Sequence, residues 1–429
     1  MSTLNIEKYN EALKYRPETI KKLFPNSKAL IVSGKVIHAT MVKLRQEGIK
    51  CMTIAANGRN EWVIEGALRA ADKTDSAIII EIAKSECNYC PVNFDNIAKK
   101  VNDIIEKYDL KVVVAVHADH YAIKTHDDIA PAKKQIPQMI EKGITSIAID
   151  ASHLLPHDNV LANIELAKLI PSWISLETEV GEIKGAQGLS TPEDALYHIG
   201  ALNAYGIFPT WIALNNGSVH GLEATGGNID ADVTSEIHNA IKKYGVYGAQ
   251  HGTSGNNYEK LREIVEKTNT TKANVATALQ MISWGIRVNE FGNAVMDANG
   301  DFIKEDNAGM SKEAWEYMKK LAAENGFKAG DYKKLNKPAD DYLKNLPEDI
   351  QRRMAKGVED FIANLLENVF NAKGSAHRAL DIILENKSHE IKGFDKIIED
   401  KNKWTREYII EEGKKIYNED NAIEGNFDD

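Results

Sequence analysis

The feature that most limits how this chain can fold is a repeated alternation of short, β-branched apolar runs with longer segments of helical period. This alternation predicts a parallel sheet built from strand–helix units. Eight strand-like runs follow one another along the chain: Met52–Ala56, Ala77–Ile82, Lys111–His117, Ser146–Asp150, Ile174–Val180, Thr210–Leu214, Val246–Gln250 and Gly285–Val288. Eight successive units favour a closed α/β barrel, a (β/α)8 TIM barrel, over an open doubly wound sheet. A further strand-like run at 29–34 leaves the count open by one.

The segments outside this repeat are interpreted as helical additions. We expect an N-terminal helical extension over 1–26, a barrel domain over 27–380 with a helical insertion at about 296–348, and a C-terminal helical extension over 381–429. A chain of 429 residues, 43% of them hydrophobic, can bury one large barrel with additions, although its length alone would also allow two domains.

Charge and hydropathy narrow the class of protein. The formal net charge of −10 argues against a nucleic-acid-binding protein, because such proteins need a clustered basic surface. No apolar run approaches the roughly 20 residues of a membrane helix, so no membrane association is expected. A cytoplasmic enzyme acting on a small molecule fits best. Its three cysteines, Cys51, Cys87 and Cys90, are expected to be thiols, and the C-x-x-C pair lacks the second pair that a zinc site needs.

Polar residues follow the predicted strands. In a barrel of this kind the residues just past the carboxyl ends of the strands surround one mouth, where catalysis takes place. The residues expected there include Asn57, Lys84, Asp119, His120, Asp150, Ser152, Glu179, Glu182, His220, His251 and Asn289. We expect Asp150 and Ser152 to contact a substrate.

Three of these residues are histidines from separate strand ends. One histidine alone would indicate little, because most histidines lie on the surface or are satisfied in a core. His120, His220 and His251, with a carboxylate beside the first, predict a catalytic divalent metal, with zinc as the expected ion and an open position for substrate. His117 could support this site or simply fill the barrel interior.

Glycines beside two of the histidines indicate a place for an anion. Gly221 follows His220, and His251 begins the sequence HGTSG. Glycines let the backbone approach a ligand closely, and the successive amides with the Ser254 hydroxyl can hold a phosphate.

Six segments follow one another along the chain: VVVAVHADH, IAIDASHLL, ISLETEVGEI, NNGSVHG, HGTSG and GIRVN. They resemble, in the same order, the H-x-D-H, ID-x-S-H, E-x-E-L-G, GNVHG, HG-[GA]-SG and K-[IM]-N segments of the class II fructose-bisphosphate aldolase family. The stretch VFNAKGSAHRA is similar to the family's closing helix. The resemblance covers roughly 48–379, and several motifs in order are more specific than any one of them.

The resemblance implies a role for each matching residue. It makes His120, His220 and His251 zinc ligands, Glu179 a supporting or alternative ligand, and Asp119 the general acid/base. It assigns substrate contacts to Asn57 and Asn289, and phosphate contacts to Gly221, Gly252 and Ser254. The reaction implied is the reversible aldol cleavage of fructose 1,6-bisphosphate in glycolysis and gluconeogenesis. A homodimer or homotetramer is also implied, while a monovalent-cation requirement is left open.

The chain departs from the family pattern at two places. Ala186 and Gln187 stand where the family's mobile loop carries glutamates, which leaves Glu182 as a candidate for that proton transfer. On the phosphate side several expected residues are replaced, and Lys84 and Arg287 are the candidates to compensate, with Arg59 a third. These departures keep open another ketose phosphate such as tagatose bisphosphate, or a non-catalytic sugar-phosphate-binding barrel. A mechanism with a Schiff base on Lys84 is disfavoured because it would not require the three histidines.

Overall fold

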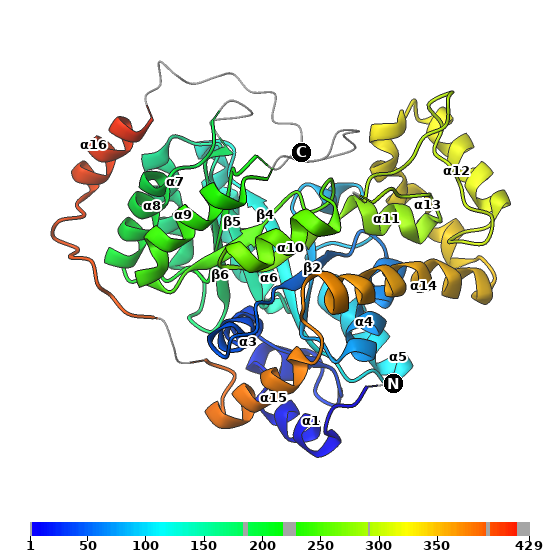
Figure 1. Ribbon diagram of the computed structural model, residues 1–429, viewed down its shortest axis with the longest axis horizontal. Coiled ribbons are helices and arrows are strands. Elements are labelled where there is room, and N and C mark those ends of the chain that lie inside the picture. Colours follow the sequence, from blue (N-terminus) through cyan, green and yellow to red (C-terminus); the bar gives the residue numbers. More distant parts are fainter. Residues whose placement is uncertain (1, 183–187, 218–228, 291, 392–394, 418–429) are drawn as a thin grey trace.

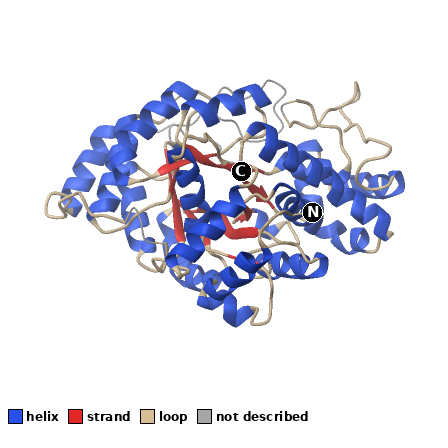
Figure 2. Cartoon of the chain, turned by 60° about the horizontal axis from the view of Figure 1, so that its bottom comes forward, coloured by secondary structure: helices blue, strands red, loops and turns tan. Residues whose placement is uncertain are grey.

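The protein folds around one closed parallel barrel. The computed structural model describes residues 2–182, 188–217, 229–290, 292–391 and 395–417. Eight strands form the barrel: β2 (Thr53–Asn57), β3 (Ile78–Ala83), β4 (Val113–Ala122), β5 (Ser146–Asp150), β6 (Ser175–Val180), β7 (Trp211–Leu214), β8 (Tyr247–Gln250) and β9 (Thr270–Val275). Each pairs in parallel with the next, and β9 returns to β2 to close the ring. The predicted (β/α)8 fold is confirmed, and Figure 2 shows the strands surrounded by helices.

The position predicted for the eighth strand is wrong. The segment at 285–288 follows helix α11 (Thr277–Trp284) and forms only isolated antiparallel bridges, from Ile286 to Lys304 and from Val288 to Ala294. The true eighth strand, β9, lacks an apolar run because Lys272 and Asn274 point into the barrel interior, where both are buried. The extra run near the N-terminus forms a short strand, β1 (Leu30–Ile31), which pairs with the start of β4 outside the ring.

A layer of helices covers the barrel. Its members are α3 (Gly34–Gln46), α4 (Glu61–Thr74), α5 (Ile97–Tyr108), α6 (Ile129–Glu141), α7 (Pro156–Ala167), α8 (Pro192–Ala204), α9 (Ala231–Ile241) and α10 (Tyr258–Lys267), with α11 after β9. Their starts carry the expected signals: Thr191 and Asp194 form a capping box before α8, and the Asn60 side chain accepts from the Val63 amide before α4. These caps satisfy amides that the first helical turn leaves without partners.

One further helix belongs to the outer layer and lies beside α4. Helix α14 (Glu348–Asn364) continues into a π-helical turn at Leu365–Val369 and packs against α4. Gly66 makes this close approach possible, because a Cβ there would lie 2.5 Å from the Ala355 carbonyl oxygen and 2.6 Å from Val358. A side chain at Gly66 would push the two helices apart.

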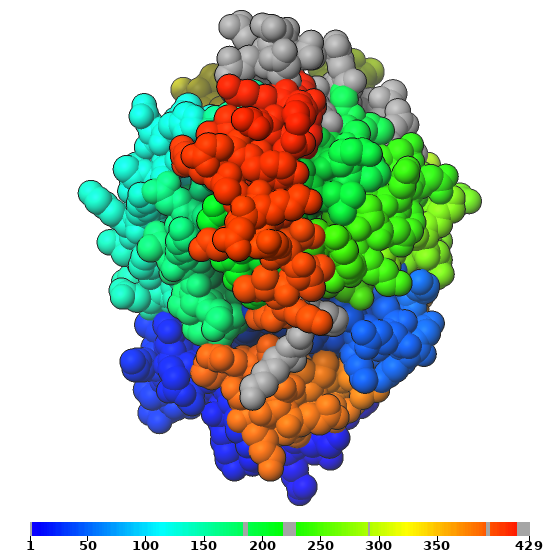
Figure 3. Space-filling view, turned by 90° about the vertical axis from the view of Figure 1, so that its left-hand side faces the viewer, coloured from blue at the N-terminus to red at the C-terminus, as the bar shows by residue number. Residues whose placement is uncertain are grey.

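Helices from both ends of the chain lie against the barrel. They are α1 (Ile6–Ala12), η1 (Leu13–Tyr15) and α2 (Glu18–Leu23) at the N-terminal side, and α15 (Ser375–Asn386) and α16 (Arg406–Ile416) at the C-terminal side. Helix α1 packs on α15, and α16 packs on α7 and α8, where the Tyr197 hydroxyl donates to the Ile409 carbonyl at 2.5 Å. The C-terminal segment therefore runs across one face of the barrel, as Figure 3 shows in orange and red.

The segment after α11 forms a helical lobe at one side of the molecule. It contains α12 (Lys312–Glu324), the 3-10 segment η6 (Ala329–Leu335) and α13 (Asn336–Lys344), drawn mainly in yellow in Figure 1. The lobe has its own apolar cluster, in which Trp315, Met318 and Leu335 pack with Trp62 and Trp284 of the barrel helices. Among the helices that the structure describes, none combines the length and apolar character needed to cross a membrane.

Candidate active site

A cavity of about 500 Å³ opens at the carboxyl ends of the strands. The ends of β2, β3, β4, β8 and β9 and part of the helical lobe line it. Among its wall residues are Asn57, Lys84, Asp119, His120, His251, Gly252, Ser254 and Asn274. The convergence of the strand ends thus brings together most of the described residues that the sequence analysis predicted for the site.

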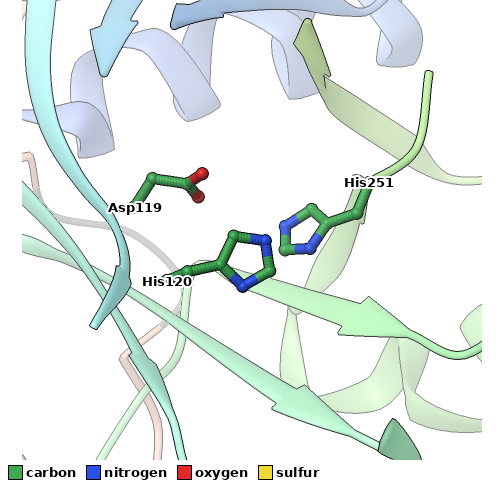
Figure 4. Close-up of side chains that lie close together, drawn as sticks. All are labelled: Asp119, His120 and His251. Atoms are coloured by element: carbon green, nitrogen blue, oxygen red, sulfur yellow. The ribbon is translucent and has the colours of Figure 1, made fainter. Parts of the chain in front are cut away.

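A distortion of β4 brings two neighbouring side chains to this cavity. Consecutive residues of a regular strand point to opposite faces. The pairing of β4 with β5 shifts between Ala118 and Tyr121, and His120 has a φ of +38°, which is rare for a residue other than glycine. Because of this bulge, both Asp119 and His120 face the mouth. Figure 4 shows the two side chains beside His251, which comes from the end of β8.

These three side chains have the arrangement of a metal site. Asp119, His120 and His251 each offer a ligand atom, and these atoms lie within 4.8 Å of one another. The two imidazole rings have centroids 4.3 Å apart. Glu179, at the end of β6, places Oε2 3.5 Å from Nδ1 of His120 and 3.7 Å from Nδ1 of His251. Two imidazoles with carboxylates are a donor set that suits zinc.

The electrostatics of the cluster favour a cation. Burial would lower the pKa of His120, but the negative charges of Asp119, Glu179 and Asp150 raise it well above its usual range. Burial raises the pKa of Glu179, and the charges of Asp150 and Glu182 add to that effect. Several buried carboxylates therefore share one small volume, which is costly unless positive charge compensates them. A divalent cation between the histidines would supply it.

Two residues expected to contact substrate lie behind His120 instead. Asp150 Oδ2 is 3.3 Å from Nδ1 of His120, and Asp150 Oδ1 accepts from the amide of Ser152 at 3.0 Å and from its hydroxyl at 2.6 Å. Neither residue is part of the cavity wall that the described residues form. Burial raises the pKa of Asp150, but its contacts with His120 hold it below the usual range. This ionised carboxylate can orient the His120 ring.

Asp119 is held by a side chain of β9 and lies close to another of its own strand, β4. The Asn274 side-chain amide donates to Asp119 Oδ1 at 2.9 Å, and His117 Nε2 lies 3.7 Å from the same oxygen. Burial raises the pKa of Asp119, but the charge of His120 and the contact with His117 hold it well below the usual range. Asp119 is therefore an ionised, hydrogen-bond-accepting carboxylate beside the two histidines.

A buried charge network fills the barrel interior below this cluster. The Lys272 ammonium, fully buried, donates to Glu177 Oε2 at 2.7 Å and to His117 Nε2 at 3.1 Å, and lies 3.4 Å from Glu81 Oε2. Since an ammonium only donates, His117 must accept at Nε2 and donate from Nδ1 to Ser146, 2.6 Å away. Glu81, His117 and Asp119 could geometrically hold a second metal, but the ammonium already takes that place.

The β2 and β3 loops form a different part of the wall. Arg59 and Glu86 make a buried ion pair at 2.6 Å, and the Asn57 amide donates to the same carboxylate at 2.6 Å. Lys84 donates to the Ala122 carbonyl at 2.7 Å, and burial lowers its pKa. Arg59 is therefore already neutralised, while Lys84 stays in the cavity wall where it was expected.

The helical lobe completes the cavity. Ala329, Gly330 and Lys333, all in η6, line it beside Tyr89. The Lys333 ammonium lies 6.0 Å from the centre of the Tyr89 ring, and the Lys337 amide donates to the Tyr89 carbonyl at 3.1 Å. An insertion remote in sequence from the strand ends thus contributes a cation to the site.

Comparison with known proteins agrees with this geometry. Residues 40–326 match the family described as fructose-bisphosphate aldolase class-II. The chain belongs to the class II fructose-bisphosphate aldolase family. Members of this family are lyases, so the cavity described above is the place to look for aldol chemistry.

The aldolase relatives are distant in sequence. The fructose-bisphosphate aldolase of Streptococcus pneumoniae is 27% identical over 230 residues, which cover 52% of this chain and 71% of that protein. A probable fructose-bisphosphate aldolase of Bacillus subtilis is 26% identical over 142 residues, covering 33% of this chain and 46% of that protein. At 26–27% identity these relatives agree with the family assignment, and the substrate of this chain is a separate question.

Solved aldolase structures share the fold. The YdjI aldolase of Escherichia coli K12 superimposes with a TM-score of 0.52 at 16% identity, covering 80% of this chain and 97% of that one. The fructose-bisphosphate aldolase of Campylobacter jejuni gives a TM-score of 0.52 at 19% identity, covering 81% and 97% of the two chains.

Two residues expected in this aldolase site lie elsewhere. Arg287 and Asn289 are exposed, Arg287 is paired with Glu305, and neither is part of the described cavity wall. Asn274 takes the place expected of Asn289, because β9 is the true eighth strand. The signal was present in the sequence: Lys272–Asn274 has the K-x-N form of the family segment to which 285–289 was assigned.

Further expectations concern residues inside or beside the segments that the structure does not describe. His220 and Gly221, expected as a zinc ligand and a phosphate contact, lie outside the described residues, as do Ala186 and Gln187. Glu182 is half-buried and close enough to Glu179 to affect its pKa, but it is not part of the described cavity wall.

Proposed function

We propose that this chain is a zinc-dependent class II aldolase that cleaves fructose 1,6-bisphosphate reversibly to dihydroxyacetone phosphate and glyceraldehyde 3-phosphate. The observation that carries the proposal is the grouping of Asp119, His120 and His251 within 4.8 Å at the barrel mouth. A structural zinc site would not need an ionised carboxylate held beside its ligands. We propose His120, His251 and the undescribed His220 as ligands, with Glu179 as a supporting or alternative one.

Asp119 is the proposed general acid/base. Bound zinc would polarise the ketose carbonyl and so stabilise the negative charge that develops on bond cleavage. Asn274 donates to Oδ1 of Asp119 and the Lys272 ammonium lies 3.9 Å from the same oxygen, which leaves Oδ2 to meet a substrate hydroxyl. From that position Asp119 takes the proton of the hydroxyl one carbon beyond the scissile bond, and returns it in the reverse direction.

The loop after β8 is the proposed phosphate site near the metal. Gly252 has a φ of +60°, and Gly252, Thr253 and Ser254 all line the cavity. The Ser254 hydroxyl is buried and has no hydrogen-bond partner among the described residues. A buried hydroxyl in this state is ready to bind a ligand oxygen, since leaving it without a partner costs free energy.

A different ketose phosphate is the second candidate substrate. The ion pair of Arg59 with Glu86 favours this candidate, because a neutralised Arg59 adds little to the binding of a second phosphate. Tagatose bisphosphate and fructose 1-phosphate differ from fructose 1,6-bisphosphate in hydroxyl configuration and phosphate number, respectively. The proton transfer that the family loop usually performs is assigned to Glu182 in either case.

A coupled cleavage assay tests the proposal. The metal-quantified protein is assayed with fructose 1,6-bisphosphate, tagatose bisphosphate and fructose 1-phosphate, with and without a chelator. We expect turnover of fructose 1,6-bisphosphate that is lost on chelation and restored by zinc. Turnover of only one of the other sugars would replace the substrate, and zinc binding without any turnover would favour a non-catalytic sugar-phosphate-binding barrel.

A further inference from the structure

Glu177 lies inside the barrel and uses its two oxygens for two different partners. Its Oε1 is 2.9 Å from Nε2 of His251, and its Oε2 accepts from the Lys272 ammonium at 2.7 Å. The exposed fractions are 1% for Glu177, 0% for Lys272 and 4% for His251, so water does not compete for these contacts. None of the catalytic steps proposed above uses Glu177 or Lys272.

These contacts fix which nitrogen of His251 carries the proton. The Glu177 carboxylate accepts from the Lys272 ammonium at 2.7 Å in a fully buried ion pair, so it is ionised and only accepts. His251 must therefore donate from Nε2. In the neutral ring the lone pair is then on Nδ1, the nitrogen that lies 3.7 Å from Glu179 Oε2 on the metal side.

Lys272 in turn prevents Glu177 from turning away. Its ammonium also donates to His117 Nε2 at 3.1 Å, and His117 is held by Ser146 at 2.6 Å. Lys272 is on β9 and His117 on β4, so side chains from two other strands fix the orientation of the Glu177 carboxylate on β6. Because these contacts hold Glu177 in place, its carboxylate cannot follow His251 of β8 if that ring moves.

We propose that Glu177, locked in place by Lys272, is a positioning residue that presents Nδ1 of His251 to the metal. This inference rests on the metal site of the proposed function. Partners of this kind, which orient a metal-binding histidine, typically change metal affinity by about 10- to 100-fold when they are removed. Glu177 and Lys272, buried in the barrel interior, would therefore raise zinc affinity without contacting the metal or the substrate.

Glu177→Asp and Glu81→Asp form a matched pair of test variants. Both carboxylates are fully buried and contact Lys272, at 2.7 and 3.4 Å, but only Glu177 contacts His251. Both exchanges keep the charge and withdraw the carboxylate by one methylene. We expect Glu177→Asp to weaken zinc binding by about tenfold or more, and Glu81→Asp to change it by less than about twofold. Zinc affinity is measured on metal-free protein by competition with a chromophoric chelator.

The visible spectrum of cobalt-substituted protein gives a second readout. A changed ligand geometry in Glu177→Asp alters that spectrum, whereas a general loss of packing does not. If Glu177→Asp fails to fold, Glu177→Gln takes its place, because one amide oxygen cannot accept from both His251 and Lys272.

The outcomes separate the inference from the proposed function. Wild-type zinc affinity in a folded Glu177 variant, or equal losses in the Glu177 and Glu81 variants, would overturn the inference. A selective loss with Glu177→Asp supports it even if no ketose phosphate is cleaved, in which case only the proposed function fails. A wild-type chain that binds no zinc would overturn the inference directly.

Discussion

Two parts of the cavity wall are built in different ways. The part formed by β4, β8 and β9 carries ionised or metal-type side chains, such as Asp119 and His251, held by buried hydrogen bonds. The part formed by the β2 and β3 loops and the helical lobe carries the cations Arg59, Lys84 and Lys333, and Arg59 forms a buried ion pair with Glu86. In the function proposed above, the first part moves protons and holds the metal, and the second receives the remote end of the anionic substrate. The difference suggests that reaction type and substrate choice are determined separately.

The largest effect is expected at the centre of the first part. Asp119→Asn keeps the shape of the side chain but removes the base, so we expect kcat to fall by about 10²- to 10⁴-fold, the usual contribution of a general base. Zinc content should stay at the wild-type level because His120 and His251 are unchanged. Cleavage kinetics and metal analysis on the same sample check both expectations. Retained activity would contradict the assignment of Asp119 and move the base to another carboxylate.

Asp150→Asn separates metal binding from proton transfer within the same part. Asp150 serves His120 through Oδ2 and Ser152 through Oδ1, and one amide oxygen cannot replace both. We expect zinc affinity to fall by about 10-fold or more, with most of the lost activity recovered at high zinc concentration. Activity that stays low at saturating zinc would show instead that Asp150 contacts the substrate, as the sequence first suggested.

The sequence predicted residues in both parts, such as His251 in the first and Lys84 in the second, and missed others in each. Strand ends of a parallel barrel converge, so Asp119, His120 and His251 could be placed from the spacing of apolar runs alone. Lys272 and Asn274 were missed because a strand that points charged and amide groups into a barrel lacks the apolar signature of a strand. Lys333 was missed for another reason: nothing in a sequence indicates over which loop an inserted lobe will fold.

Lys333→Ala tests a cavity residue of the helical lobe, whose contribution the sequence did not predict. Lys333 lines the cavity, whereas its neighbour Lys334 is exposed and paired with Asp331 at 2.8 Å. We expect Lys333→Ala to raise KM for fructose 1,6-bisphosphate by about tenfold, equivalent to about 1.4 kcal/mol, and to leave KM for fructose 1-phosphate nearly unchanged. Lys334→Ala is the control and should change neither. Equal changes for both sugars would mean that the lobe shapes the cavity without recognising its charge.

The smallest effect is expected from Ser254→Ala, which removes one hydroxyl near the metal side. A single hydrogen bond contributes about 0.5–1.5 kcal/mol, so KM should rise by about 2- to 10-fold. The loop places Ser254 beside His251, and every candidate substrate carries a phosphate at that end, so the increase should be the same for mono- and bisphosphates. That equality is the sharpest contrast with Lys333→Ala, whose effect should depend on the second phosphate. If Ser254→Ala instead affected only the bisphosphate, the two ends of the substrate would have to be exchanged in the cavity, and the lobe would then lie over the reacting end.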